Sequence, residues 1–436
     1  MMKRMLGFGA GLSGLILLAG WGLQGGEPLP ASATTAAGLM RPHIAGVIRA
    51  ARPAETQPAG DAFTRPLHRG PTATPSPSPL DRIRQITFAD SRHGWAGGLN
   101  DCYVGLCPYA LDATTDGGRT WQTRPDPSVL SNGQSGDSVY TMRFSSAQDG
   151  WLLADVPWVT HDSGFTWKPT LPGGRIALLE THQGNAWALQ EHCGAEQLCH
   201  YTLLVSADGG YTWQRRSTPP ALGWEPQQLV RLDAQHAWIL AAQADHHFAL
   251  IHTSDAGYTW QILPTPPGAA GWFAALSALP GGTLWLMTGI GGEGRHNQTK
   301  ILYTSTDGGR RWHTQAAGLW PEYPDVSPNE RTALSLPDNP AALSLTLPYD
   351  DQLAGFGLLA PGRAWYTVGF GSPRFTKDGG RTWPNFFQWL KGNGQVFGGP
   401  IVVLQPRYGW MAASSVVYYT TDGGTVWNST QVPGHP

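Results

Sequence analysis

The sequence predicts an all-β protein, a seven-bladed β-propeller with four antiparallel strands in each blade. Three observations lead to this prediction. An eight-residue motif recurs seven times, and short apolar runs typical of strands surround each copy. The composition disfavours helices, because the 436 residues include 56 Gly and 36 Pro, which helix interiors exclude. The 20 Trp are spread along the chain and argue against global disorder.

The residues before the repeats are expected to direct export. Lys3 and Arg4 open the chain, an apolar stretch is centred on Leu12–Leu18, and Ala31–Ala33 offers a cleavage site. The apolar stretch is also about long enough to span a bilayer. Residues 1–33 are therefore either a cleaved signal peptide or an uncleaved membrane anchor. Both alternatives place the rest of the chain outside the cytoplasm, secreted or tethered to the membrane.

Residues 34–80 form the next segment. Proline, alanine and threonine dominate it, as in Pro71–Pro79, and it has almost no hydrophobic periodicity. Such a segment cannot bury enough apolar surface to offset the entropy of ordering. We expect a disordered stalk, followed by the propeller over residues 81–436.

The repeated octet has the pattern [ST]-x-D-x-G-x-x-W. Its aspartates lie 44 to 71 residues apart and are Asp116, Asp162, Asp208, Asp255, Asp307, Asp378 and Asp422. Its closing tryptophans are Trp121, Trp167, Trp213, Trp260, Trp312, Trp383 and Trp427. Seven copies at near-regular spacing indicate seven structural units.

Each unit is expected to contain four strands, A to D. A second tryptophan lies in an apolar run before each octet: Trp95, Trp151, Trp187, Trp238, Trp285, Trp365 and Trp410. A further β-branched or apolar run precedes that tryptophan, as in Ile86–Ala89, and another follows the octet, as in Trp260–Leu263. Four strands in about 45 residues match one propeller blade. With this assignment, packing between blades closes the ring, and the two chain ends share no blade.

The octet suits the turn between strands C and D. Its glycines tolerate positive φ, and its aspartate can accept backbone N–H bonds within the turn. The alternative is a catalytic or calcium-binding role for these aspartates. Seven equivalent carboxylates around a ring cannot all contribute to one active site. Calcium usually takes 6–8 oxygen ligands, and each turn has a single carboxylate. We therefore expect the octets to be structural, with no catalytic residue, no metal and no cofactor.

The octets resemble the Asp-box, or BNR repeat, of sialidase-type propellers. Together with the preceding Gly-Trp strands, as at Gly94–Trp95, they are most similar to the photosystem II stability and assembly factor family over about Arg84–Val432. This resemblance implies the propeller fold and a role in binding protein. Members of that family are reported to use a basic patch. The residues after Ile83 carry 21 basic and 27 acidic side chains, net −6, which does not supply one.

The links between strands A and B are short and are expected on the same face as the octets. The B–C and D–A links then share the opposite face, where their lengths vary, and we expect this variable face to bind the partner. Two cysteine pairs, Cys102–Cys107 and Cys193–Cys199, fall in B–C links, and we expect each to form a disulfide. A four-cysteine metal site is the less favoured alternative.

The largest insertion spans about His313–Gln352. It places aromatic residues among charges, and the candidate partner-binding residues are Trp320, Tyr323, Asp325, Glu330, Arg331 and Tyr349. The alternative is a loop that covers the central channel or a neighbouring blade. Gly291–His296 and Asp245–His247 are further exposed candidates, the second more simply explained as a hairpin tip.

The sequence therefore favours an exported, non-catalytic scaffold that binds an extracytoplasmic or membrane protein. The alternatives are a sialidase-like glycoside hydrolase and a module that binds surface polysaccharide. The aromatic-Arg-Ile-Pro signature of sialidases is absent, and its nearest counterpart is Asp81–Arg84. Nucleic acid is excluded as a partner, because the net charge is only −2 and no region is strongly basic.

Overall fold

The computed structural model describes the propeller and leaves the N-terminal segments out. The described residues are 82–99, 109–125, 139–154, 157–170, 175–194, 198–220, 223–243, 247–266, 269, 271, 273–290, 297–318, 350–351, 353–368, 373–385, 398–404 and 406–433. All of the described strands belong to one of the two units into which the chain divides. The expected signal or anchor and the stalk lie outside the described residues. No described segment is a helix long and apolar enough to cross a membrane.

The strands form seven sheets that follow one another along the chain. Blade one contains β1 (Arg82–Phe88), β2 (Gly94–Leu99), β3 (Tyr109–Thr114) and β4 (Gln122–Arg124). Blade two contains β5 (Thr141–Phe144), β6 (Gly150–Leu153), β7 (Pro157–Thr160) and β8 (Lys168–Pro169). Blade three contains β9 (Arg175–His182), β10 (Asn185–Cys193), β11 (Cys199–Ser206) and β12 (Gln214–Ser217). Blade four contains β13 (Glu225–Arg231), β14 (Ala237–Ala242), β15 (Phe248–Thr253) and β16 (Gln261–Leu263).

The remaining blades include two departures from four strands. Blade five contains β17 (Phe273–Leu279), β18 (Thr283–Ile290), β19 (Asn297–Ser305), β20 (His313–Gly318) and β21 (Asp350–Asp351). Blade six contains β22 (Leu353–Ala360), β23 (Arg363–Val368) and β24 (Arg374–Thr376). Blade seven contains β25 (Gly398–Leu404), β26 (Tyr408–Ala413), β27 (Val416–Thr420) and β28 (Asn428–Gln431).

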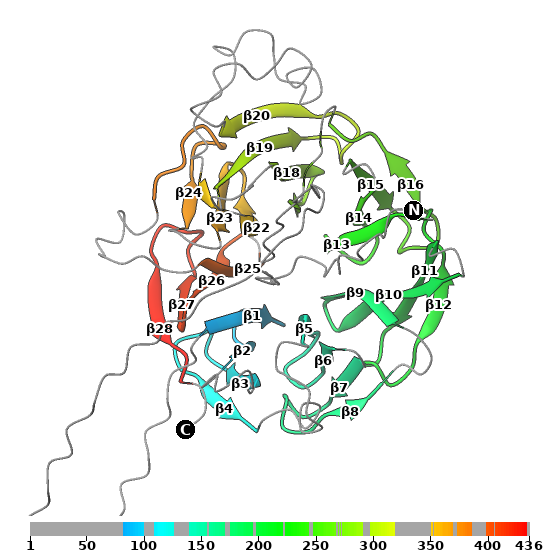
Figure 1. Cartoon of the computed structure of the whole chain (residues 1–436). Coiled ribbons are helices and arrows are strands. Elements are labelled where there is room, and N and C mark those ends of the chain that lie inside the picture. The colour runs from blue at the N-terminus through cyan, green and yellow to red at the C-terminus, as the bar shows by residue number, and fades with distance from the viewer. Residues whose placement is uncertain are drawn as a thin grey trace, which may run out of the picture. The chain divides into compact units, whose positions relative to one another are not determined.

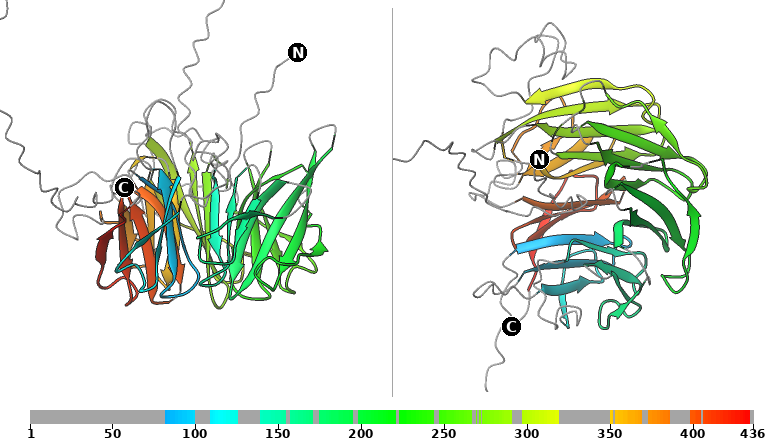
Figure 2. Two further views of the ribbon diagram at one scale, coloured as in Figure 1. Left: turned by 90° about the horizontal axis from the view of Figure 1, so that it is seen from below. Right: turned by 45° about the vertical axis from the view of Figure 1, so that its right-hand side comes forward.

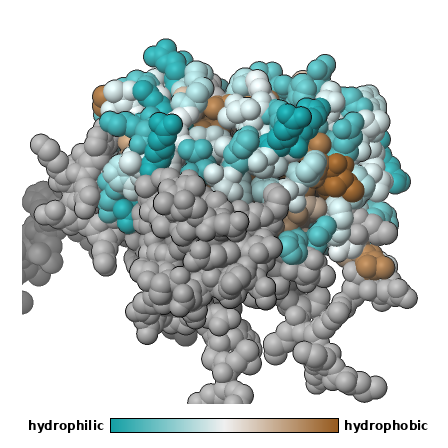
Figure 3. Space-filling model, turned by 90° about the horizontal axis from the view of Figure 1, so that it is seen from above, coloured by the Kyte–Doolittle hydropathy of each residue, from teal (hydrophilic) through white to brown (hydrophobic). Residues whose placement is uncertain are grey.

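The seven sheets stand around a ring, which confirms the predicted seven-bladed propeller (Figure 1). Within each blade, consecutive strands pair antiparallel, as β13 to β16 do in blade four. An edge-on view shows the strands running between the two faces of the ring (Figure 2). Hydrophilic and neutral residues mix on the described surface in Figure 3, and hydrophobic residues occupy separate spots.

The departures in blades five and six have local causes. In blade six a single bridge between Arg374 and Asn385 replaces strand D among the described residues. Pro384 follows the octet directly there and lacks the N–H that a strand ladder needs. In blade five, β21 comes from the end of the insertion and pairs with the start of β19.

The hydrophobic core lies between the blades, and each junction has its own cluster. The strand-B tryptophans are buried in these clusters in all seven blades. Trp151 of blade two meets Trp213 of blade three edge-to-face, with ring centroids 6.1 Å apart, and Trp187 and Trp260 repeat the contact at 6.4 Å. Burying one Trp removes about 150–250 Å² from water, an upper bound of about 4–6 kcal/mol each. The repeated tryptophans thus join each blade to the next.

Packing between blades seven and one closes the ring, and none of the described strands is shared between them. Phe88 of β1 stacks on Trp410 of β26, with centroids 3.7 Å apart. The indole N–H of Trp410 donates to the carbonyl of Gly117 at 2.9 Å, and the N–H of Ile83 donates to the carbonyl of Ser414 at 2.9 Å. The closing junction therefore uses the same kind of contact as the other junctions. Blades one and seven lie side by side in the ring (Figure 1).

Candidate functional site

The octets form the C–D turns, and each aspartate is bound by its own turn. In blade two, the Thr160 hydroxyl donates to Asp162 Oδ1 at 2.8 Å. The backbone N–H and the hydroxyl of Thr166 donate to the two carboxylate oxygens, at 2.8 and 2.6 Å. The same acceptor role recurs at Asp116, Asp208, Asp255, Asp307, Asp378 and Asp422. These carboxylates hold turns together and belong to separate blades, so they do not converge on one substrate.

The hydrogen bonds keep the octet carboxylates ionised. At Asp208 the largest cause is the hydroxyl of Thr212, whose bond lowers the carboxyl pKa to about 2. The hydroxyl of Thr259 lowers the pKa of Asp255 to about 2 in the same way. A general acid near neutral pH needs a raised pKa, and these groups have the opposite.

Backbone contacts place the octets on the face of the short A–B links. In blade one the N–H of Gly117 donates to the carbonyl of Arg92 at 2.8 Å. Equivalent bonds reach the A–B links of blades two, four, five, six and seven. The glycines are required here, because Gly210 has φ +95° and a Cβ at that position would lie 2.8 Å from the Trp151 ring. The octets and A–B links therefore form one face, and the B–C and D–A links lie at the other ends of the strands.

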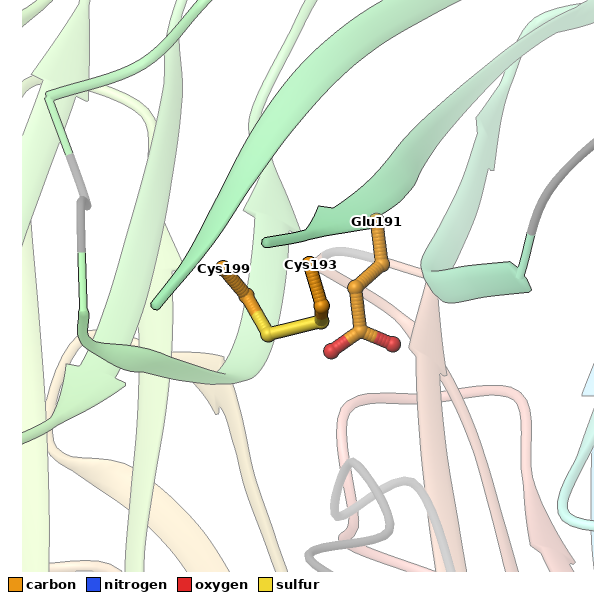
Figure 4. A group of neighbouring side chains, drawn as sticks. All are labelled: Glu191, Cys193 and Cys199. Atoms are coloured by element: carbon orange, nitrogen blue, oxygen red, sulfur yellow. A yellow bond between two sulfur atoms is a disulfide. The ribbon is translucent and has the colours of Figure 1, made fainter. Parts of the chain in front are cut away.

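The B–C link of blade three carries a disulfide on this variable face. Cys193 at the end of β10 and Cys199 at the start of β11 are joined by a disulfide with a Cα–Cα distance of 4.0 Å. The carboxylate of Glu191 lies beside it, and the donor atoms of the three residues fall within 4.8 Å of one another (Figure 4). Both sulfurs are oxidised in the disulfide, so this group offers no thiolate to a metal ion.

Charged residues surround the disulfide on the same face. Arg175 at the start of β9 forms an ion pair with Glu191 at 3.0 Å. Glu191 also hydrogen-bonds the hydroxyl of Tyr201, which is buried on β11. Burial raises the pKa of Tyr201, and the charges of Glu191 and Glu225 raise it further. The hydroxyl is thus both inaccessible and hard to ionise.

The other candidates lie partly outside the described residues. Cys102 and Cys107, the run Gly291–His296, and Asp245 with His246 are outside them. So are the insertion residues proposed for partner binding, Trp320, Tyr323, Asp325, Glu330, Arg331 and Tyr349. The structure does show that the N–H of Gln243 donates to the carbonyl of His247 at 2.8 Å, as a hairpin tip would.

The sequence did not identify the contacts that charged residues of strands A make with the neighbouring blade. Arg143 on β5 forms an ion pair with Glu180 on β9 at 2.6 Å, joining blades two and three. Arg231 on β13 lies 4.3 Å from the Trp187 ring of blade three, and burial lowers its pKa to about 10. Charges within otherwise apolar strand-A runs are the signal in the sequence that could have revealed these contacts.

Comparison with known proteins supports the fold. No family model matches the chain, and no curated protein matches it either. Among solved structures, YCF48 bound to a D1 peptide is 17% identical over 84% of this chain and 98% of its own, with a TM-score of 0.49. A sialidase of Trypanosoma rangeli is 11% identical over 70% of this chain and 53% of its own, with a TM-score of 0.39.

An ancestral GH74 enzyme is 10% identical over 82% of this chain, with a TM-score of 0.52. This chain covers 48% of that enzyme, about half of its length. At such identities the likeness concerns the fold alone. The chain shares the fold of this enzyme over 82% of its own length.

Proposed function

We propose that this protein is a non-catalytic propeller scaffold that works outside the cytoplasm and binds a partner protein through its variable face. The observation that carries the proposal is the blade-three hairpin. Leu198 is 51% exposed, although it is a large apolar residue, and it directly precedes the disulfide-bonded Cys199. This apolar side chain, held beside a disulfide and near charged residues, offers a partner protein apolar area to bury with polar groups around it.

The export prediction and the disulfide support the proposed location. A disulfide persists in an oxidising compartment and is rare in the cytosol. The partner is then an extracytoplasmic or membrane protein, and the insertion residues around Trp320 remain predicted contacts with it. The mild negative charge of the folded part disfavours anionic polymers as ligands for this face.

Site-specific photo-crosslinking tests the proposal in the full chain. A photoreactive residue at Leu198 is expected to capture one defined protein, and the same residue at Thr425 on the octet face is not. Leu198→Asp should abolish capture by a second probe at Gly194. Equal labelling from both faces, or an unchanged pattern with Leu198→Asp, would contradict the proposal.

A sialidase-like hydrolase is the second candidate, and the Tyr201–Glu191 pair with Arg175 is the observation that bears on it. Sialidases use a Tyr–Glu pair and arginines that bind the substrate carboxylate. Here Tyr201 is buried and its pKa is raised, which opposes nucleophilic attack. Release of a fluorophore from a sialoside, lost in Tyr201→Phe, would favour the enzyme over the scaffold.

A further inference from the structure

The sixth position of the octet faces solvent, and in three consecutive blades it holds an aromatic residue. Phe165, Tyr211 and Tyr258 of blades two, three and four are 51%, 69% and 62% exposed. The other octets have polar residues at this position: Arg119, Arg310, Arg381 and Thr425. Single exposed apolar residues are ordinary, but three rings at one motif position of adjacent blades form a row.

Each ring is supported on one face by a side chain from the preceding blade. The Arg124 guanidinium of blade one lies 4.4 Å from the centre of the Phe165 ring. The guanidinium of Arg216 in blade three lies 4.2 Å from the centre of the Tyr258 ring. Between them, the imidazole of His161 in blade two stacks on Tyr211, with centroids 3.9 Å apart and planes 8° apart.

The supporting groups are themselves held in place. Arg124 donates from Nε to the carbonyl of Ser163 at 3.2 Å, and Arg216 donates to the carbonyl of Ala256 at 3.4 Å. His161 Nδ1 lies 2.8 Å from Asp149 Oδ1. The three aromatic side chains are therefore held in place by the blades beside them. One face of each aromatic ring is packed against its supporting group, and the other is open to solvent. Ligand binding to them needs little further ordering.

The exposed residues on the neighbouring outer strands are mostly polar, although Ile262 on β16 is 55% exposed. Lys168, Gln214, Arg215 and Gln261 are exposed on the outer strands β8, β12 and β16. The aspartate of each octet lies three residues before its ring, so the same turns carry negative charge as well. The core of a protein interface is usually a contiguous apolar patch, and three rings from three separate blades suit one less well.

We propose that Phe165, Tyr211 and Tyr258 form an aromatic row that binds a neutral polysaccharide along the octet face. The face of an aromatic ring carries partial negative charge and attracts the polarised C–H groups of a sugar ring. A polymer of repeated sugars matches a row of repeated rings, and the neighbouring amide, guanidinium and ammonium groups can bind its hydroxyls. The mixed charges favour an uncharged polymer over an anionic one.

Affinity electrophoresis of the full chain tests this proposal. Native gels would contain hydroxyethyl cellulose, xyloglucan, galactomannan or laminarin, with alginate as the charged comparison. At least one neutral polymer should retard the protein. Each single change, Phe165→Ala, Tyr211→Ala or Tyr258→Ala, should weaken binding about three- to tenfold. The triple variant should migrate as it does without polymer.

Matched variants separate binding from folding. Tyr211→Phe keeps the ring and should bind as the unaltered protein does, and Thr425→Ala and Val426→Ala change the same turn of blade seven and should also have no effect. Thermal unfolding checks that the triple variant is folded.

The proposal is overturned if no neutral polymer retards the protein, if the triple variant is still retarded, or if only alginate acts. Binding to anionic vesicles that the triple variant loses, without retardation by polymer, would assign the row to a lipid surface instead. Because the row and Leu198 lie on opposite faces, each proposal can fail independently of the other.

Discussion

Each octet aspartate accepts several hydrogen bonds from its own turn, and this makes the turn sensitive to its removal. Asp162→Ala deletes the acceptor for the backbone N–H and hydroxyl of Thr166 and for the hydroxyl of Thr160. We expect the free energy of unfolding to fall by about 1–3 kcal/mol, as for other charged hydrogen-bond acceptors. Urea denaturation measures this loss. Gln261→Ala, on an exposed edge strand, is the control and should change stability little.

Acid should weaken the octets in a defined range of pH. Folding lowers the pKa of Asp208 and Asp255 from 3.8 to about 2. The stabilisation that these ionised groups give is therefore complete above about pH 4 and is lost as the pH falls towards 2. Thermal unfolding between pH 5 and pH 2 should show the decline. The stability of a double variant, Asp208→Asn with Asp255→Asn, should decline less steeply over this range. An equal slope would contradict the role of these two carboxylates in the acid response.

At the scale of single elements, the β10–β11 hairpin depends on its disulfide. Closing a loop of about seven residues stabilises the fold by roughly 2 kcal/mol in the chain-entropy model. Replacing Cys193 and Cys199 by alanine should lower stability by about this amount. Hydrogen exchange should increase near Glu191 and Tyr201 and remain unchanged in blades five to seven. Faster exchange throughout the ring would show that the hairpin supports more than its own blade.

The elements that follow the repeat could be predicted from the sequence, and the contacts between them could not. Each octet marks a turn and each strand-B tryptophan marks a core position, because their chemistry is local. The support of Phe165 by Arg124 joins side chains of two separate sheets, and no motif records it. Tyr201 is likewise buried in the cluster between blades three and four, which includes Leu229 and Ile239 of blade four. Neighbouring blades, rather than the repeat itself, determine these sites.

At the scale of the whole molecule, the closing junction should be as strong as the others. Trp410→Ala removes the stack with Phe88 and the hydrogen bond to Gly117, and Trp95→Ala removes the stack with Phe144 at 3.5 Å. Both variants should lose about 3–5 kcal/mol of stability, the usual range for a buried Trp. Chemical denaturation compares them. A much smaller loss for Trp410→Ala would mean that the ring opens easily between blades one and seven.

The first and last described strands, β1 and β28, belong to different blades, and this has a consequence for how the gene can be rearranged. A linker from the residue after β28 to the residue before β1, with a new break between β12 and β13, leaves every sheet made of the same strands. Such a circular permutant should fold to the same ring, whereas a break between β10 and β11 would divide a blade. The gene could therefore begin with any of the seven units, provided that their cyclic order is kept.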